Sequence, residues 1–313
     1  MCTSCGCQGQ GTTMTNLQTG ARAEIAALPE QDGVGHSLGD HGHGHFHGAH
    51  HADDEHHRDG HDHHAHEHDH SHHEHAHAHA HDHTDADVHS HRRVDLEARI
   101  LAKNDAIAAK CRAWLAGREI VALNLVSSPG AGKTALLERA IADLSGELPL
   151  FVIEGDQATS NDGERIRAAG APVVQVNTGT GCHLDAEMIA RALSELKPSV
   201  GSLLFIENVG NLVCPALFDL GEHAKAVIFS TTEGEDKPLK YPHMFSAAKL
   251  VIFNKIDLLP HLDFSMERAR ENVLRVNPDA EIVEVSAKTG AGMQTLYDWI
   301  RAQRMAVKEQ ALV

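Results

Sequence analysis

The sequence predicts an α/β domain built on a mostly parallel β-sheet with helices on both faces. Short apolar runs rich in branched residues recur from residue 120 onward, and segments with helical periodicity separate most of them. Strands joined by crossover helices form parallel sheets that are covered on both sides. Roughly 220 residues follow residue 91, which is enough for one well-buried domain of this kind.

The first expected element of this domain is a helix over Val94–Leu115. Its apolar residues recur at helical spacing and fall on one face, which we expect to pack against the core. The thiol of Cys111 lies on this face and is therefore predicted to be a core group. The residues of the face are Leu96, Ile100, Ile107, Cys111 and Leu115.

Seven short apolar runs are predicted to be strands. They are Ile120–Val126, Pro149–Asp156, Pro172–Thr178, Ser202–Asn208, Ala224–Thr231, Lys249–Lys255 and Glu281–Ala287. Helical patterns such as Asp185–Leu196 lie between most of them. Ligands of open parallel sheets bind at the carboxyl ends of the strands, so we expect functional residues there.

The N-terminal part has a different composition. Between His41 and His91, 23 of 51 residues are histidine, and nearly all the others are Asp, Glu, Gly, Ala or Ser. So little apolar surface cannot offset the entropy of ordering the chain. We therefore predict a metal-binding motif at residues 1–10, a disordered linker with the His-rich tract at 11–91, and a folded domain at 92–313.

Composition also bears on the class of protein. The formal net charge of −17 argues against nucleic acid as a partner. The sequence contains no run of 18 apolar residues, so no membrane span is predicted, and the N-terminus lacks a secretory signal. The six cysteines show no pairing framework, and three of them lie within the first seven residues, which indicates metal binding rather than disulfides. These features predict a cytoplasmic protein.

A phosphate-binding loop is predicted at SSPGAGKT, between a strand and a helix. The segment nearly fits the pattern GxxxxGK[ST], although Ser127 stands where the first glycine is usual. Its glycines would let backbone N–H groups surround phosphate oxygens, its lysine would contact the β- and γ-phosphates, and its threonine would reach Mg²⁺. The alternative is a glycine-rich turn with a surface lysine. The predicted ligands are Gly130, Ala131, Gly132, Lys133 and Thr134.

Two further motifs predict that the nucleotide is GTP. In NKID, the Asp257 carboxylate would accept hydrogen bonds from N1–H and the 2-amino group of guanine, a donor pair that adenine lacks. Asn254 is expected to contact the base edge and the stem of Lys255 to lie along the ring. The second motif, SAK, ends the next strand, where the Ala287 N–H would meet the guanine O6. It comprises Ser286, Ala287 and Lys288.

Two acidic residues at strand ends are candidates for the Mg²⁺ site. Asp156 ends VIEGD, and Glu207 ends LLFIE and is followed by Gly210, which should sense the γ-phosphate. Either acid would hold Mg²⁺ directly or through water, and Asp156 would also orient the attacking water. The alternative for each is an acid that caps a loop. No arginine finger and no Gln after Gly210 are evident, so unaided hydrolysis should be slow.

Two groups of thiols predict transition-metal sites. The thiolates of Cys2, Cys5 and Cys7 can close around one ion, and removal of Met1 would add the free amine of Cys2 as a fourth ligand. Planar coordination by sulfur and nitrogen suits Ni(II), whereas tetrahedral coordination would suit Zn²⁺. The alternatives are a redox pair or an unused cluster. The second group is Cys182, His183 and Cys214, on loops that leave carboxyl ends of strands. A tetrahedral site needs a fourth ligand besides these three, and water or a symmetry-related chain would supply it.

The histidines from His41 to His91 are predicted to be a flexible metal reservoir. Neutral imidazole is a good ligand for Ni, Cu and Zn, and many weak sites suit storage rather than catalysis. A purification tag is the first alternative, but tags are usually terminal and uninterrupted. A pH-responsive linker is the second, because imidazoles titrate near pH 6.5.

Taken together, CxxCxC, the His-rich tract, SSPGAGKT, ENVGNLVCP and NKID closely resemble the HypB family, the GTPases that help insert nickel into [NiFe]-hydrogenase. The resemblance covers essentially the whole chain. It implies a SIMIBI-class P-loop GTPase that dimerises with GTP bound, and partners of two kinds, a HypA-type nickel chaperone and the hydrogenase large-subunit precursor. It also implies a tight nickel site at Cys2, Cys5 and Cys7, and a nickel or zinc site at the dimer interface formed by Cys182, His183 and Cys214.

Two other functional classes stay open. One is a nickel storage protein with an accessory GTPase, against which the intact Lys133, Thr134 and Asp257 argue. The other is a sister metallochaperone, either the urease GTPase UreG or a cobalamin-enzyme chaperone. The segments MCTSCGC and ENVGNLVCP of this chain do not resemble the sequences of the UreG family.

Overall fold

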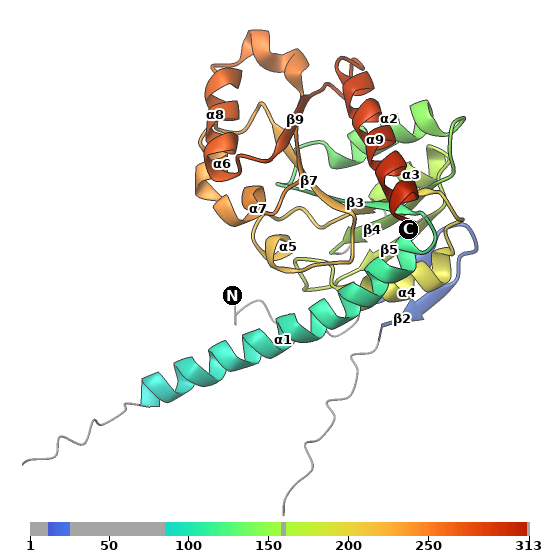
Figure 1. Cartoon of the computed structure of the whole chain (residues 1–313), viewed down its shortest axis with the longest axis vertical. Coiled ribbons are helices and arrows are strands. Elements are labelled where there is room, and N and C mark those ends of the chain that lie inside the picture. Colours follow the sequence, from blue (N-terminus) through green and yellow to red (C-terminus); the bar gives the residue numbers. More distant parts are fainter. Residues whose placement is uncertain (1–11, 26–84, 158–160, 312–313) are drawn as a thin grey trace, which may run out of the picture. The chain divides into compact units, whose positions relative to one another are not determined.

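A computed structural model describes residues 12–25, 85–157 and 161–311 of the chain (Figure 1). Residues 12–25 and those from 89 onward belong to one compact unit. The cysteine motif and residues 41–84 of the His-rich tract lie outside the described residues, so what was predicted for them stays a prediction. No helix in the described part of the chain is both long and apolar enough to cross a membrane.

Within these residues, nine strands form one sheet in the order β2-β1-β5-β4-β6-β3-β7-β8-β9. Strands β3 to β9 are parallel to one another, which confirms the predicted sheet. These seven strands are β3 (Val121–Ser127), β4 (Leu150–Asp156), β5 (Val173–Asn177), β6 (Leu203–Glu207), β7 (Ala224–Ser230), β8 (Leu250–Asn254) and β9 (Glu281–Glu284).

Helices cover both faces of this sheet (Figure 1). One face packs against α2 (Lys133–Leu144), α3 (Asn161–Ala168) and α9 (Met293–Ala311). The other face packs against α1 (Asp85–Ala116), α4 (Ala186–Leu196), α7 (Pro242–Ser246) and α8 (Met266–Val276). The shorter elements are α5 (Cys214–Leu217), α6 (Lys237–Lys240) and the 3-10 helix η1 (Ile256–His261).

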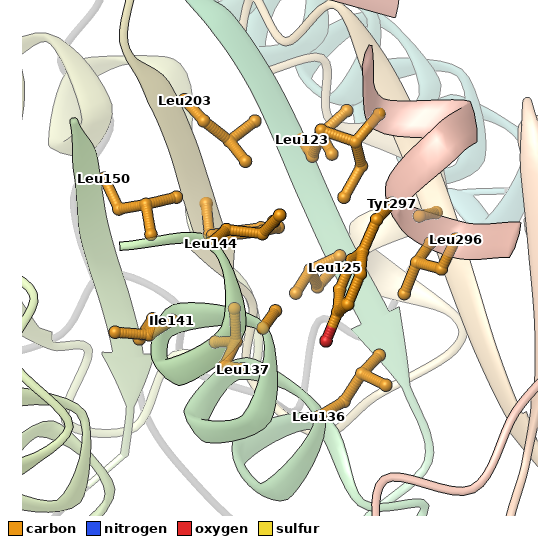
Figure 2. Close-up of a cluster of buried hydrophobic side chains, with 14 of the residues drawn as sticks. Leu123, Leu125, Leu136, Leu137, Ile141, Leu144, Leu150, Leu203, Leu296 and Tyr297 are labelled. Carbon is orange, nitrogen blue, oxygen red and sulfur yellow. The ribbon is translucent and has the colours of Figure 1, made fainter. Parts of the chain in front are cut away.

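The core beneath α2 fixes the helix that follows the phosphate-binding loop. Leu137 and Ile141 of α2 lie between Leu125 of β3 and the residues of neighbouring strands, and Tyr297 of α9 closes the cluster (Figure 2). Leu137 and Ile141 are fully buried. Since α2 carries Lys133 and Thr134 in its first turn, this packing also holds those two side chains in place.

Replacing Leu137 by alanine should lower the free energy of unfolding by about 2–5 kcal/mol, because it removes buried methyl groups and leaves a cavity. Urea denaturation of the variant and the native chain measures the difference. Leu274→Ala is the matched control, since Leu274 on α8 is 43% exposed and its loss should change stability by less than about 0.5 kcal/mol. Equal losses for the two variants would contradict the core described above.

The prediction that the whole apolar face of the first helix packs against the core is wrong for Leu96 and Ile100. Helix α1 begins at Asp85, before the predicted domain start at residue 92. Cys111 and Leu115 are buried as predicted, but Leu96 and Ile100 are 58% and 44% exposed. Among the described side chains of α1, Ile107, Cys111 and Leu115 pack on this core cluster. Helical periodicity identified the face of the helix but not the length over which the sheet covers it.

The prediction of a disordered linker over residues 11–91 is wrong for residues 12–25. Strands β1 (Thr13–Asn16) and β2 (Arg22–Glu24) form an antiparallel hairpin, and β1 pairs antiparallel with β5. The hairpin is short and contains one buried apolar side chain, Met14, so no periodic pattern marks it in the sequence. Thr13 pairs with Asn177, the last residue of β5, so the chain enters the sheet beside the strand end that leads to Cys182.

Candidate nucleotide and metal-binding sites

The predicted phosphate-binding loop connects β3 to α2 in a conformation that requires glycine. Gly130 and Gly132 have φ angles of 76° and 96°, in the left-handed region that other residues avoid. A Cβ atom on Gly132 would lie 2.6 Å from Asn254 Nδ2. The loop therefore lies directly against the NKID segment, and Gly132 leaves the room that this contact needs.

Lys133 is held inside this loop. Its ammonium group donates a hydrogen bond to Ser127 Oγ over 3.0 Å, so the serine that replaces the usual glycine serves as a partner for the lysine. Burial lowers the pKa of Lys133, and the nearby Glu207 carboxylate opposes this shift. The result is a cation at the N-terminus of α2 with few competing partners, as anion binding there requires.

Two buried carboxyl groups face the first turn of α2. Glu207 accepts a hydrogen bond from Thr134 Oγ1 over 2.8 Å and pairs in register with Glu154 on the neighbouring strand. Burial raises the pKa of Glu207 to about 7 and that of Glu154 to about 9, and the proximity of Glu207 adds to the second shift. Among the described residues, the Oε2 atoms of both have no hydrogen-bond partner.

These unsatisfied buried oxygens fit a divalent cation, since carboxylate and hydroxyl oxygens are the ligands that Mg²⁺ prefers. The sequence prediction named Asp156 and Glu207 but missed Glu154. An acid inside an apolar strand, two residues before Asp156, was the available signal. Asp156 ends β4 and is half-buried.

Asn254 lies between the phosphate-binding loop and the SAK segment. It is buried, and its amide nitrogen donates to the Ala131 carbonyl over 2.9 Å. Its Oδ1 accepts hydrogen bonds from the backbone N–H groups of Lys255 and Ala287, at 2.8 and 3.3 Å. Both Asn254 and the Ala287 N–H were expected to meet the base. Their hydrogen bonds connect the phosphate-binding loop to the SAK segment, and their contact with the base stays a prediction.

The other residues predicted to bind guanine surround this connection. Asp257 Oδ1 accepts a hydrogen bond from Ser286 Oγ over 2.6 Å. Lys255 donates to the Gly130 carbonyl over 2.7 Å, and Lys288 is exposed. The NKID and SAK segments therefore lie together beside the phosphate-binding loop.

The ENVG segment and a lysine missed by the sequence analysis complete this edge of the sheet. A Cβ atom on Gly210 would lie 3.3 Å from Pro129 of the loop, so the segment after Glu207 packs against the loop. Lys237 donates to the Ser128 hydroxyl and forms an ion pair with Glu233 at 2.8 Å. Its position after the carboxyl end of β7 was the signal that would have identified it.

Cys182, His183 and Cys214 lie together although 32 residues separate the two thiols. The two sulfur atoms are 2.9 Å apart, Cys182 Sγ is 3.7 Å from His183 Nδ1, and all three potential ligand atoms lie within 4.8 Å of one another. The His183 ring packs on Phe218 with a centroid distance of 3.9 Å. Burial lowers the pKa of His183 to about 4, so its imidazole is neutral at pH 7 and has a lone pair to donate.

This group fits a transition metal in chemistry and nearly in geometry. Thiolate and imidazole ligands suit Zn²⁺ and Ni²⁺, and three of them leave one position open. Sulfur atoms bound tetrahedrally at about 2.3 Å from an ion lie about 3.8 Å apart, so the thiols would have to separate slightly. Since Cys214 begins α5 on the segment that follows Gly210, the metal and nucleotide sites share one stretch of chain.

Comparison with known proteins shows the family to which this chain belongs. Residues 121–284, more than half of the chain, match the family model described as CobW/HypB/UreG, nucleotide-binding domain. The chain belongs to the CobW/HypB/UreG family. The matched region begins with β3 and ends with β9, so it contains the phosphate-binding loop, NKID and all three members of the Cys182, His183 and Cys214 group.

Within this CobW/HypB/UreG family, the similar relatives carry the name hydrogenase maturation factor HypB. The protein from Rhizobium leguminosarum bv. viciae is 57% identical over 221 residues, which are 70% of this chain and 74% of that protein. The protein from Escherichia coli K12 is 54% identical over 215 residues, 69% of this chain and 74% of that one. The crystal structure of HypB from Helicobacter pylori in complex with nickel covers 65% of this chain and 96% of its own, at 37% identity and a TM-score of 0.61.

Proposed function

We propose that this chain is a GTP-hydrolysing nickel metallochaperone that supplies Ni(II) for the maturation of [NiFe]-hydrogenase. One observation carries the proposal: the short stretch ENVGNLVCP holds a buried acid beside the phosphate-binding loop at one end and a metal-ligating thiol at the other. A nucleotide switch and a metal site joined in this way suit timed delivery of an ion. The name of the similar relatives, hydrogenase maturation factor HypB, supports the choice of hydrogenase as the recipient.

In the nucleotide site, each of the residues described above has its own role. The ammonium group of Lys133 would leave Ser127 for the β- and γ-phosphates, and the hydroxyl of Thr134 would turn from Glu207 toward the cation. Mg²⁺, when bound, neutralises charge on the phosphates. Asp156 orients the attacking water. Because no arginine finger and no glutamine after Gly210 are available, turnover without a partner is slow.

In the metal site, Cys182, His183 and Cys214 bind the transported nickel, and Zn²⁺ competes for the same ligands. A second copy of the chain supplies the remaining coordination in a GTP-dependent homodimer. The thiols of Cys2, Cys5 and Cys7 form a separate, tighter nickel site, and the His-rich tract is a reservoir. Ions then pass, with a HypA-type chaperone, to the hydrogenase large-subunit precursor in the cytoplasm.

A strain from which the gene for this chain is deleted tests the proposal. We expect hydrogenase activity to be lost, urease activity to be kept, and millimolar nickel in the medium to restore part of the hydrogenase activity. Assays of both enzymes with and without added nickel provide the measurement, and reintroducing the native gene is the control. Loss of urease with normal hydrogenase would reassign the chain to the urease pathway.

Deleting residues 41–84 should lower the number of nickel ions bound per chain while leaving GTP hydrolysis unchanged. The segment contains 21 of the 28 histidines, and the deletion keeps α1 complete. Equilibrium dialysis counts the ions. A chain of full length with these histidines replaced by glutamine separates loss of imidazole from loss of length. An unchanged nickel count in both variants would exclude the reservoir.

A further inference from the structure

Four buried polar residues lie between the candidate Mg²⁺ site and the two metal-binding loops. They are Asn124, Asn208, Glu222 and Lys225, and none is more than 8% exposed. Burying such groups is unfavourable unless their hydrogen bonds are made, and a buried ion pair is rarely better than apolar packing for stability alone. A connected set of them in the core therefore points to a role in positioning.

The first connection runs from the phosphate side to the loop of His183. Asn208 directly follows Glu207, whose carboxylate binds Thr134. The Asn208 Oδ1 atom accepts hydrogen bonds from the N–H groups of Val209 and Leu184, at 3.0 and 3.2 Å. Leu184 is the residue after His183, so one side-chain amide connects the end of β6 to the imidazole-bearing loop.

The second connection continues from the same amide. Asn208 Nδ2 donates to Asn124 Oδ1 over 3.2 Å, and Asn124 Nδ2 donates to Glu222 Oε1 over 3.0 Å. The other oxygen of Glu222 accepts from the Leu220 N–H over 2.7 Å. Every polar atom of the two amides that faces the core is thereby paired.

Lys225 completes the connection at the loop of Cys214. Its ammonium group lies 3.8 Å from Glu222 and donates to the carbonyl oxygens of Pro215 and Phe218, at 2.7 and 3.3 Å. Pro215 follows Cys214, and the ring of Phe218 packs on His183. Lys225 therefore holds both ends of α5.

We propose that Asn208, Asn124, Glu222 and Lys225 are positioning residues that make metal binding at Cys182, His183 and Cys214 depend on the nucleotide. When the carboxylate of Glu207 changes partners as the cation and nucleotide bind, Asn208 moves with it. Its hydrogen bonds then shift the loop of His183 and, through Asn124, Glu222 and Lys225, the loop of Cys214. The proposal deepens the function proposed above and rests on it. It assigns the coupling to a buried hydrogen-bonded chain rather than to the segment between Gly210 and Cys214 alone.

The test uses the reciprocity of coupling, because nickel must shift nucleotide preference as much as nucleotide shifts nickel affinity. The ratio of affinities for a fluorescent GDP and a non-hydrolysable GTP analogue is measured on the full chain with and without Ni(II). We expect nickel to change this ratio by about fivefold or more, the lower end of typical couplings. Cys214→Ala should abolish the change.

The variant Glu222→Gln with Lys225→Met keeps the side-chain volumes and leaves no buried charge unpaired. In it, and in Asn208→Ala, the nickel-dependent change should fall to within about twofold of none, while Asn277→Ala keeps the native change. Asn277 is the matched control because its amide donates to the backbone carbonyls of Phe245 and Ala248, which belong to neither site. Variants are compared after circular dichroism shows native folding.

The outcomes separate the two proposals. A native chain without any nickel-dependent change would overturn the nucleotide-controlled delivery itself. A native change that persists at full size in either folded variant would overturn only the role of the buried chain. Loss of the change in Asn277→Ala as well would show a general loss of stability and would equally overturn that role.

Discussion

Lys133→Ala should lower the rate of GTP hydrolysis by about a hundredfold to a thousandfold, the usual loss when one charge-stabilising donor is removed. The half-buried lysine lies in the first turn of α2, where its ammonium group is held inside the loop by Ser127. Hydrogenase maturation should fail in the same variant even with added nickel, because the nucleotide cycle drives delivery. Phosphate release and hydrogenase activity in the complemented deletion strain measure the two effects.

Lys110→Ala is the control for this variant. Lys110 is an exposed lysine of α1, so its loss removes one positive charge without touching the loop. It should hydrolyse GTP at the native rate. Normal hydrolysis by a folded Lys133→Ala variant would remove Lys133 from the reaction and leave the glycine-rich segment as a structural turn.

Cys214→Ala should weaken nickel binding at the site of Cys182 and His183 by more than about a hundredfold, because losing a ligand costs more than losing a group that only orients one. The background is a chain in which Cys2, Cys5 and Cys7 are serine and residues 41–84 are absent, so that other nickel sites do not hide the effect. Titration against a chelator of known affinity measures the dissociation constant.

Cys111→Ala is the matched control for Cys214→Ala. Cys111 is also a free thiol, but it is buried on α1 and its sulfur faces the Ala186 carbonyl at 3.7 Å. Its replacement should leave nickel affinity unchanged. Equal nickel affinity in the Cys214→Ala and native chains would mean that the close approach of the two thiols serves packing and not metal binding.

Most of the parallel strands were predictable because they are buried on both faces and read as continuous apolar runs, whereas the edge strand β9 is only partly buried. The functional motifs were predictable for a related reason, since the carboxyl ends of those runs carry the glycines, acids and thiols. The hairpin of β1 and β2 was not, because four-residue β1 has little pattern of its own and is stabilised by pairing with β5. The exposure of Leu96 and Ile100 on α1 was not predicted, because periodicity carries no information about where a partner surface ends.

The roles of single polar residues were the least predictable. The hydrogen bonds of Asn254 to two loops were not predicted, because the sequence does not show that these loops are adjacent. Glu154 and Asn124 looked like ordinary strand residues, and their partners Glu207 and Asn208 follow only from the strand order and register. Such contacts depend on tertiary structure, which local sequence patterns do not specify.

Nickel delivery by the proposed mechanism requires that the affinity of the chain for nickel depend on the bound nucleotide. The direct measurement is the nickel dissociation constant of the chain that retains only Cys182, His183 and Cys214 as strong ligands, saturated first with GDP and then with a non-hydrolysable GTP analogue. We predict that the two constants differ by about fivefold or more. Identical constants would contradict the account and leave a metal site and a nucleotide site that work independently in one chain.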